Sequence, residues 1–216
     1  MYPYSHREDV YTCGDDVAYK FPAILDYALK KYCFIQFKPR GLKPISPLGN
    51  CCIWTVYGKK CIMKNSIFPG YWQKIWLNCN SDCYYSNNFL TTEKNYLREI
   101  NHYRKIFENN PLYWNMKLSG LAQNRASYMA KRKKLLPDPS KTYDELIAYA
   151  PSANGIYLIN LLYEEALFEN SKINKLSPRK KEMARLLTSY QHYIGFGMAK
   201  NGNSVYICIK FTPKSM

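Results

Sequence analysis

Cysteine is the residue type with the clearest chemical pattern in this sequence of 216 residues. Seven of the eight cysteines precede residue 84 and one lies near the C-terminus, at Cys13, Cys33, Cys51, Cys52, Cys61, Cys79, Cys83 and Cys208. Crowded thiols either pair as disulfides in an oxidising compartment or hold zinc as thiolates. Because the spacing lacks the twice-repeated Cys-x-x-Cys of zinc knuckles, all eight are predicted as disulfide candidates, with 105 possible pairings.

Side chains suited to acid–base or nucleophilic catalysis form no recognisable set. The chain has three histidines, His6, His102 and His192, and none of them lies in a known catalytic motif. A hydrolase needs a nucleophile with a general base within hydrogen-bonding reach. We therefore predict no catalytic residue and no cofactor, and hydrolysis is the weakest of the functional hypotheses.

Positive charge is the main feature of the composition. Lysine and arginine outnumber the acids by 31 to 16, which gives a formal net charge of +15 with small clusters at residues 131–134 and 179–181. Such clusters are typical of solvated helix ends, although acidic surfaces, sulfated glycans or an anionic membrane would also suit them. No nucleic-acid-binding motif accompanies the charge, so no specific nucleic-acid partner is expected.

Targeting signals are not evident in the sequence as given. No window approaches 18 apolar residues, so no transmembrane segment is predicted. The first residues lack the apolar core of a signal peptide, although the cysteines favour an extracellular protein. If the thiols are reduced instead, the alternative is an intracellular adaptor that binds zinc through the cysteine-rich segment.

The cysteine-rich segment, residues 1–90, is predicted to form a small α+β module. Apolar spacing indicates a helix over residues 21–32, then a short strand at 34–37 and a loop rich in Pro and Gly at 38–50. Residues 52–64 predict a hairpin that turns at Gly58. The following aromatic residues are interpreted as core, with a carbohydrate or lipid platform as the alternative.

Residues 91–216 are predicted to form a second domain. Two amphipathic helices, over residues 97–107 and from Asn115 onward, are separated by Pro111. A loop, a short apolar segment at 143–150 and two further helices follow, the last beginning at Ser177. The chain then ends in strands at 193–200 and 204–211, joined by an Asn-Gly turn. Helices combined with such strands imply a sheet covered by helices.

Four segments of this second domain resemble the CAP superfamily (SCP/TAPS), which comprises cysteine-rich secretory proteins, insect antigen 5 and plant pathogenesis-related proteins. The segments are INHYR at residues 100–104, the stretch 111–126, YDELIAY at 143–149, and the terminal hairpin with its Phe-Thr-Pro ending. The bias towards Tyr, Asn, Lys and Ile and the cysteine-bearing leader are similar to those of divergent venom-allergen-like proteins of parasitic nematodes.

The resemblance implies an α/β fold class, an α-β-α sandwich CAP domain preceded by the small cysteine-rich α+β module. Many members bind a divalent metal through two His and two Glu in a central cleft. Glu145 and Glu165 fall at the acidic positions and are interpreted as a cleft remnant. Pro137 and the region of Lys181 replace the histidines, so no metal site is expected.

The resemblance also implies a function and a fate for Cys208. A secreted, non-enzymatic CAP protein of this type is expected to bind a host protein, or a sterol or fatty acid in a hydrophobic groove, within a host–parasite interaction. Cys208 stands about one residue from the usual strand cysteine of the family, and such a shift reverses the face of a strand. It is therefore expected either to face a different partner or to be a free buried thiol.

Overall fold

The computed structural model of the chain describes residues 9–13, 16–18, 35–39, 47–63, 70–76, 79, 81–167 and 181–213. The chain divides into two compact units. One comprises Met1–Pro47 with Met63–Asn65, and the other comprises Leu48–Ile62 with Ser66–Met216.

The first unit contains a three-stranded antiparallel sheet. Its strands are β1 (Asp9–Cys13), β2 (Asp16–Ala18) and β3 (Ile35–Pro39), in the order β2-β1-β3. The short strand predicted at residues 34–37 corresponds to β3. The helix predicted over residues 21–32 lies outside the described residues.

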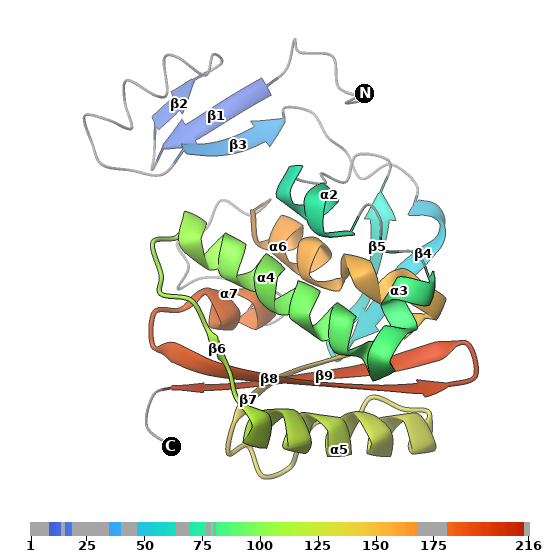
Figure 1. The fold of residues 1–216 in the computed structure, drawn as a ribbon. Coiled ribbons are helices and arrows are strands. Elements are labelled where there is room, and N and C mark those ends of the chain that lie inside the picture. The colour runs from blue at the N-terminus through green and yellow to red at the C-terminus, as the bar shows by residue number, and fades with distance from the viewer. Residues whose placement is uncertain are drawn as a thin grey trace. The chain divides into compact units, whose positions relative to one another are not determined.

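The second unit is built on a six-stranded sheet of order β5-β4-β7-β9-β8-β6 (Figure 1). Its strands are β4 (Pro47–Thr55), β5 (Gly58–Met63), β6 (Tyr113–Trp114), β7 (Asp144–Pro151), β8 (Gln191–Asn201) and β9 (Ser204–Pro213). Strands β4, β7, β9 and β8 pair antiparallel in turn, and β6 joins β8 in parallel. Both predicted hairpins are present, and the Asn-Gly turn places Gly202 at a φ of 58°.

Helices cover both faces of this sheet (Figure 1). Helix α5 (Met116–Arg132) lies on one face, where Ala122, Ala126 and Met129 contact Ile147 and Cys208. The other face buries a larger core beneath α2 (Gly70–Trp76), α3 (Ser81–Tyr85), α4 (Leu90–Ile106), α6 (Leu158–Leu167) and α7 (Lys181–Leu187). The predicted α-β-α sandwich is confirmed.

The central strand β7 was not expected, because residues 143–150 were predicted only as a short apolar segment. Leu146, Ile147 and Ala148 are consecutive buried residues that contact helices on opposite faces of the sheet. A strand that is covered on both faces loses the alternation of polar and apolar residues by which strands are recognised.

The two compact units separate near residue 47, whereas the predicted domain boundary lies between residues 90 and 91. Strand β4 pairs with β7, opposite Tyr149 and Ala148, so the β4–β5 hairpin extends the main sheet. Ile53, Trp76 and Tyr84 all belong to the larger core. The described residues of 48–62 and 70–90 therefore share their packing with the helices that follow them.

Helix α5 lies unusually close to strand β8 because two glycines face it. A methyl group on Gly195 would overlap the backbone of Ser119, and one on Gly197 would overlap the backbone of Gln123. The Gln123 amide then pairs with the backbone of Met198, accepting from its N–H (3.1 Å) and donating to its C=O (3.0 Å). Strand β6 pairs with β8 only at Tyr193 and Ile194. Farther along β8, the Gln123 side chain supplies the hydrogen bonds that the backbone of Met198 would otherwise lack at this edge.

Candidate functional site: a groove between helices α4 and α5

The predicted cysteines fall into three groups in the structure. Disulfides join Cys52 to Cys61 across the β4–β5 hairpin and Cys79 to Cys83 at α3. Cys208 is a free buried thiol on β9, and burial raises its pKa far above the usual value. The side chains of Cys13, Cys33 and Cys51 lie outside the described residues.

Glu145, one of the two predicted cleft residues, belongs to an ionic cluster at the start of β7. Its Oε1 accepts a hydrogen bond from the backbone N–H of Asp138 (2.5 Å), and its Oε2 lies 3.3 Å from Lys210 Nζ. Asp138 in turn binds Lys210 at 2.8 Å and Arg125 of α5 at 3.1 Å. The cluster fastens the loop after α5 to strand β9.

The charges of this cluster stabilise one another. The hydrogen bond from Lys210 is the main reason that the pKa of Asp138 lies well below its usual range. Burial lowers the pKa of Lys210, but the bond to Asp138 and the neighbouring negative charges outweigh burial, so the pKa is raised. Lys210 is only 1% exposed, and its ammonium therefore depends on these carboxylates.

Glu145 faces α5, whereas α6, which carries Glu165, packs on the other face of the sheet. The side chain of Glu165 lies outside the described residues, so a cleft shared by the two carboxylates stays a prediction. Within the described part of the chain, no group of three or more His, Cys, Asp or Glu side chains is arranged to hold a metal ion.

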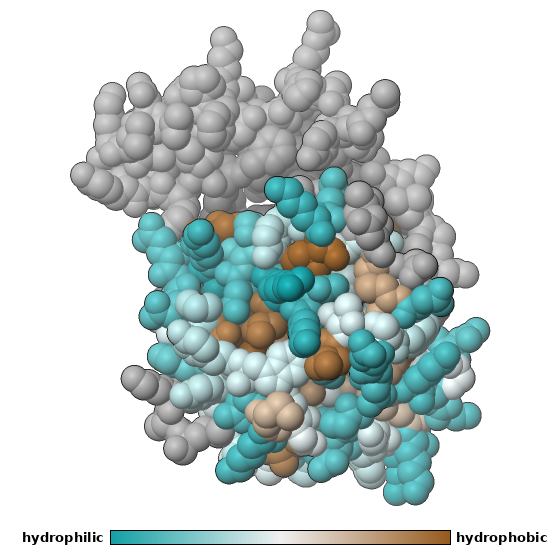
Figure 2. Space-filling model, in the orientation of Figure 1, coloured by the Kyte–Doolittle hydropathy of each residue, from teal (hydrophilic) through white to brown (hydrophobic). Residues whose placement is uncertain are grey.

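A groove of about 670 Å³ lies elsewhere, where the start of α4 faces the first half of α5 across β8. Its apolar walls come from four different elements, at Leu90, Trp114, Met116 and Phe196. The rings of Trp114 and Phe196 are in contact, with centroids 5.3 Å apart. We call this site the α4–α5 groove. In the orientation of Figure 1, Figure 2 shows apolar patches set in a largely hydrophilic surface.

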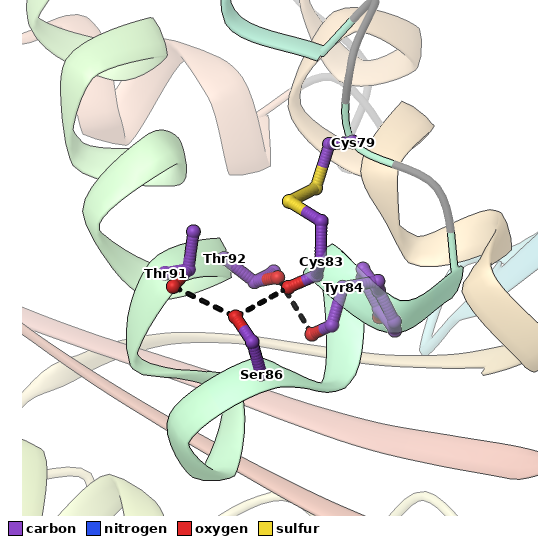
Figure 3. The surroundings of a disulfide bond; sticks show 6 residues. All are labelled: Cys79, Cys83, Tyr84, Ser86, Thr91 and Thr92. Atoms are coloured by element: carbon purple, nitrogen blue, oxygen red, sulfur yellow. Dashed lines mark hydrogen bonds between the residues drawn. A yellow bond between two sulfur atoms is a disulfide. The ribbon is translucent and has the colours of Figure 1, made fainter.

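The rim of the groove at the start of α4 is held by the Cys79–Cys83 disulfide and a short turn, η1 (Ser86–Phe89) (Figure 3). Ser86 Oγ lies 2.8 Å from both Cys83 O and Thr91 Oγ1. Thr92 Oγ1 donates to Tyr84 O at 2.8 Å. These bonds fasten η1 between α3 and α4.

The backbone of η1 is strained. Asn87, Asn88 and Phe89 have φ values of 49°, 53° and 69°, in the left-handed region that disfavours side chains. Asparagine tolerates this region better than most residues, and it is the two asparagines that line the groove. Phe89 is instead buried in the core, where it anchors the turn.

The base of the groove is formed by the α5–β8 contact. Ser119 and Gln123 line it while they bond the backbone of β8 at Phe196 and Met198. Asn115 caps α5 by accepting a hydrogen bond from the backbone N–H of Leu118 at 3.0 Å, as the predicted helix start requires. The polar groups of this wall are thus occupied by structural bonds, and Gly120 leaves open space beside them.

Glu93 is the exceptional polar residue of the groove. It is only 8% exposed, and among the described residues its carboxyl has no hydrogen-bond or ion-pair partner. Burial raises its pKa to about 7. The sequence suggests only that Glu93 complements the positive end of α4, because nothing local reveals that the folded chain encloses it.

The histidines do not line this groove. His102 stacks on Tyr71 with centroids 3.7 Å apart, and burial together with Lys105 lowers its pKa. His192 lies 2.9 Å from the carbonyl of Tyr190 through Nδ1. His6 lies outside the described residues.

Comparison with known proteins points to one family. The family model described as "Cysteine-rich secretory protein family", CAP, matches residues 97–211, which is more than half of the chain. Venom allergen-like protein 4 of Schistosoma mansoni is similar, with 22% identity and a TM-score of 0.44 over 56% of this chain and 86% of that one. The hookworm platelet inhibitor is also similar, with 10% identity and a TM-score of 0.43 over 58% and 70%. No curated protein matches the chain.

Proposed function

Because the chain belongs to the cysteine-rich secretory protein (CAP) family, we propose that it is a secreted, non-enzymatic protein that acts by binding a small ligand with an apolar body in its α4–α5 groove. The disulfides Cys52–Cys61 and Cys79–Cys83, both among the described residues, support an oxidising compartment. None of the described helices combines the length and apolar character needed to span a membrane.

The observation that carries this proposal is the lining of the groove. Small-molecule sites are concave, mostly apolar, and range over about 300–1,000 Å³. The groove has this size, and Leu90 and Met116 leave apolar surface at its rim, 40% and 78% exposed. The apolar body of a sterol or a fatty acid matches such walls. Binding of this ligand would serve a host–parasite interaction.

The proposal is tested by measuring uptake of labelled cholesterol and labelled palmitate by the full chain. Gly120→Leu is the decisive variant, because a Cβ added at this position has nothing within 4 Å and the rest of the leucine side chain would occupy the groove that Gly120 lines. We expect saturable binding by the unmodified chain and at least tenfold weaker binding by Gly120→Leu.

The matched control is Asn124→Leu, which adds similar bulk at an exposed position of α5 outside the groove. It should bind like the unmodified chain. Equal uptake by Gly120→Leu, or no saturable uptake of either lipid, would contradict a lipid site in this groove.

A second candidate function is docking to an acidic host protein or glycan through the end of α5. This helix contains no acidic residue, and Lys131 to Lys134 are all exposed. The ring of Tyr128, 44% exposed, lies between the guanidinium groups of Arg125 and Arg132 at 5.7 and 5.6 Å. Binding there would weaken steeply with added salt, unlike binding of an uncharged ligand in the groove.

A further inference from the structure

We propose that the α4–α5 groove recognises an organic cation, an amine whose apolar body lies against Trp114 and Phe196 and whose ammonium group pairs with Glu93. This inference rests on the proposed function that the groove is a ligand site, and it names the chemical class of the ligand.

The first argument is the unpartnered carboxyl. A carboxyl that is 8% exposed and has no hydrogen bond or counter-ion from the described residues depends on the water that enters the groove, and its charge is poorly stabilised there. Glu93 is 8% exposed and lines the groove, whereas the nearby Ser119 and Gln123 bond the β8 backbone. Glu93 is therefore the polar group that a ligand would satisfy.

The second argument is the aromatic wall. The faces of Trp and Phe rings attract cations through their quadrupoles, and Trp does so most strongly. Trp114 and Phe196 contact each other and both line the groove. A carboxylate beside two aromatic rings suits an ammonium group and, once Glu93 is ionised, disfavours an anionic head group at the same position.

Few charged or titratable groups surround Glu93 among the described residues. Lys94, exposed on α4, is the other charged residue of the groove, and the phenol of Tyr96 on α4 also interacts with Glu93. The described lining residues from η1, β6, α5 and β8 carry no ionisable group. An ammonium near Glu93 favours its ionised form, so binding of the amine releases a proton when the pH lies below about 7.

The test uses three probes with one body: 1-naphthylmethylamine, 1-naphthylmethanol and 1-naphthoic acid, titrated calorimetrically into the full chain. At about pH 8 we expect the amine to bind at least tenfold more tightly than the alcohol and the acid. At about pH 6, below the raised pKa of about 7, Glu93 is mostly protonated, so the amine should bind more weakly, by up to about tenfold. An alkylamine stays charged at both pH values.

Glu93→Gln keeps the shape of the side chain and removes its charge. It should abolish the preference for the amine and its pH dependence while the alcohol still binds. Glu108→Gln is the matched control, because Glu108 is exposed beyond the other end of α4. Retention of the amine preference in Glu93→Gln, or tighter binding of the alcohol or acid by the unmodified chain, overturns the inference.

Gly120→Leu separates this inference from the function on which it rests. If it blocks all three probes but the unmodified chain shows no amine preference, only the cation inference fails. If none of the probes binds while the unmodified chain still takes up labelled cholesterol or palmitate, the cation inference alone fails. If the probes and both lipids bind Gly120→Leu as they bind the unmodified chain, the groove is not the ligand site and both proposals fail.

Discussion

Glu99 is a fully buried carboxyl group at the centre of a hydrogen-bonded network in the main core. Trp76 Nε1 donates to its Oε2 at 2.8 Å, and Tyr103 Oη lies 3.1 Å from its Oε1. The same Tyr103 hydroxyl lies 3.0 Å from Asn160 Oδ1. One hydroxyl proton cannot serve both oxygens, and a protonated Glu99 resolves the conflict by donating to Tyr103, which then donates to Asn160.

The protonation of Glu99 predicts a pH-dependent stability. Burial raises its pKa to about 8 against an ordinary value of 4.5, despite the bonds from Trp76 and Tyr103 that lower it. The folded state thus holds a proton that the unfolded state releases between these values, so this contribution is complete below pH 4.5 and is lost as the pH rises to about 8.

We expect Glu99→Gln to flatten this dependence, because glutamine keeps an acceptor for Trp76 and a donor for Tyr103 without ionising. The unmodified chain should lose up to about 1.4 kcal/mol of unfolding free energy per pH unit in this window relative to the variant. Urea unfolding at several pH values measures the difference. Glu108→Gln, at an exposed site, should leave the slope unchanged, and equal slopes for Glu99→Gln and the unmodified chain would refute the assignment.

At the scale of elements, the contact between α5 and β8 depends on where the glycines lie. Gly195 and Gly197 face the backbone of α5, which leaves no room for a side chain. Gly120 lies within α5 itself, where an added methyl group meets open space. The same chemical change should therefore have opposite effects at the two kinds of position.

We expect Gly197→Ala to lower the unfolding free energy by about 2 kcal/mol, because overpacking separates α5 from β8. Gly120→Ala should raise it by about 1 kcal/mol, since alanine has the higher helix propensity. Thermal unfolding of the two variants beside the unmodified chain measures both effects. A stabilising Gly197→Ala would mean that α5 does not approach β8 as closely as the structure places it.

A second junction between elements depends on Arg104, which lies within the helix predicted over residues 97–107. Its guanidinium group donates to the carbonyls of Leu186, Thr188, Gln191 and Asn110. Leu186 and Thr188 lie at the end of α7 and just after it, Gln191 is the first residue of β8, and Asn110 lies in the segment after α4. A buried arginine thus joins three chain segments by satisfying backbone groups that no helix or strand uses.

At the scale of the whole molecule, side chains from the described parts of 48–62 and 70–90 complete the core of the family domain. Trp76, Tyr84 and Ile53 are almost completely buried in it, and Trp76 bonds Glu99. Each such side chain contributes about 1.5–3 kcal/mol when buried, and a domain is stable by only about 5–15 kcal/mol. Removing these three side chains would therefore cost a free energy comparable to the whole stability of the domain.

We therefore expect a chain of residues 48–216 to unfold cooperatively, and a chain of residues 91–216 to show no cooperative transition. Calorimetry or near-UV circular dichroism on heating distinguishes the two, with the full chain as the reference. A cooperative transition of residues 91–216 at the temperature of the longer chain would support the boundary predicted between residues 90 and 91.

The sequence by itself determined the features that depend on local pattern. Helical periodicity, a helix start near Asn115, the Asn-Gly turn and the order of the four CAP-like segments predicted the α-β-α sandwich, which is confirmed. The family membership followed from the same segments. These features can be recognised in the sequence because each depends on residues that are close together along the chain.

The tertiary structure decided what depends on residues distant in sequence. Strand β7 is central only because helices cover both of its faces, and Glu145 meets Lys210 only because β7 pairs with β9. The α4–α5 groove combines Glu93, Trp114 and Phe196 from three separate elements. Burial by such distant neighbours turns Glu93 from an ordinary helix-start acid into an unpartnered carboxyl, because the cost of its charge is set by the surrounding fold and not by its place in the sequence.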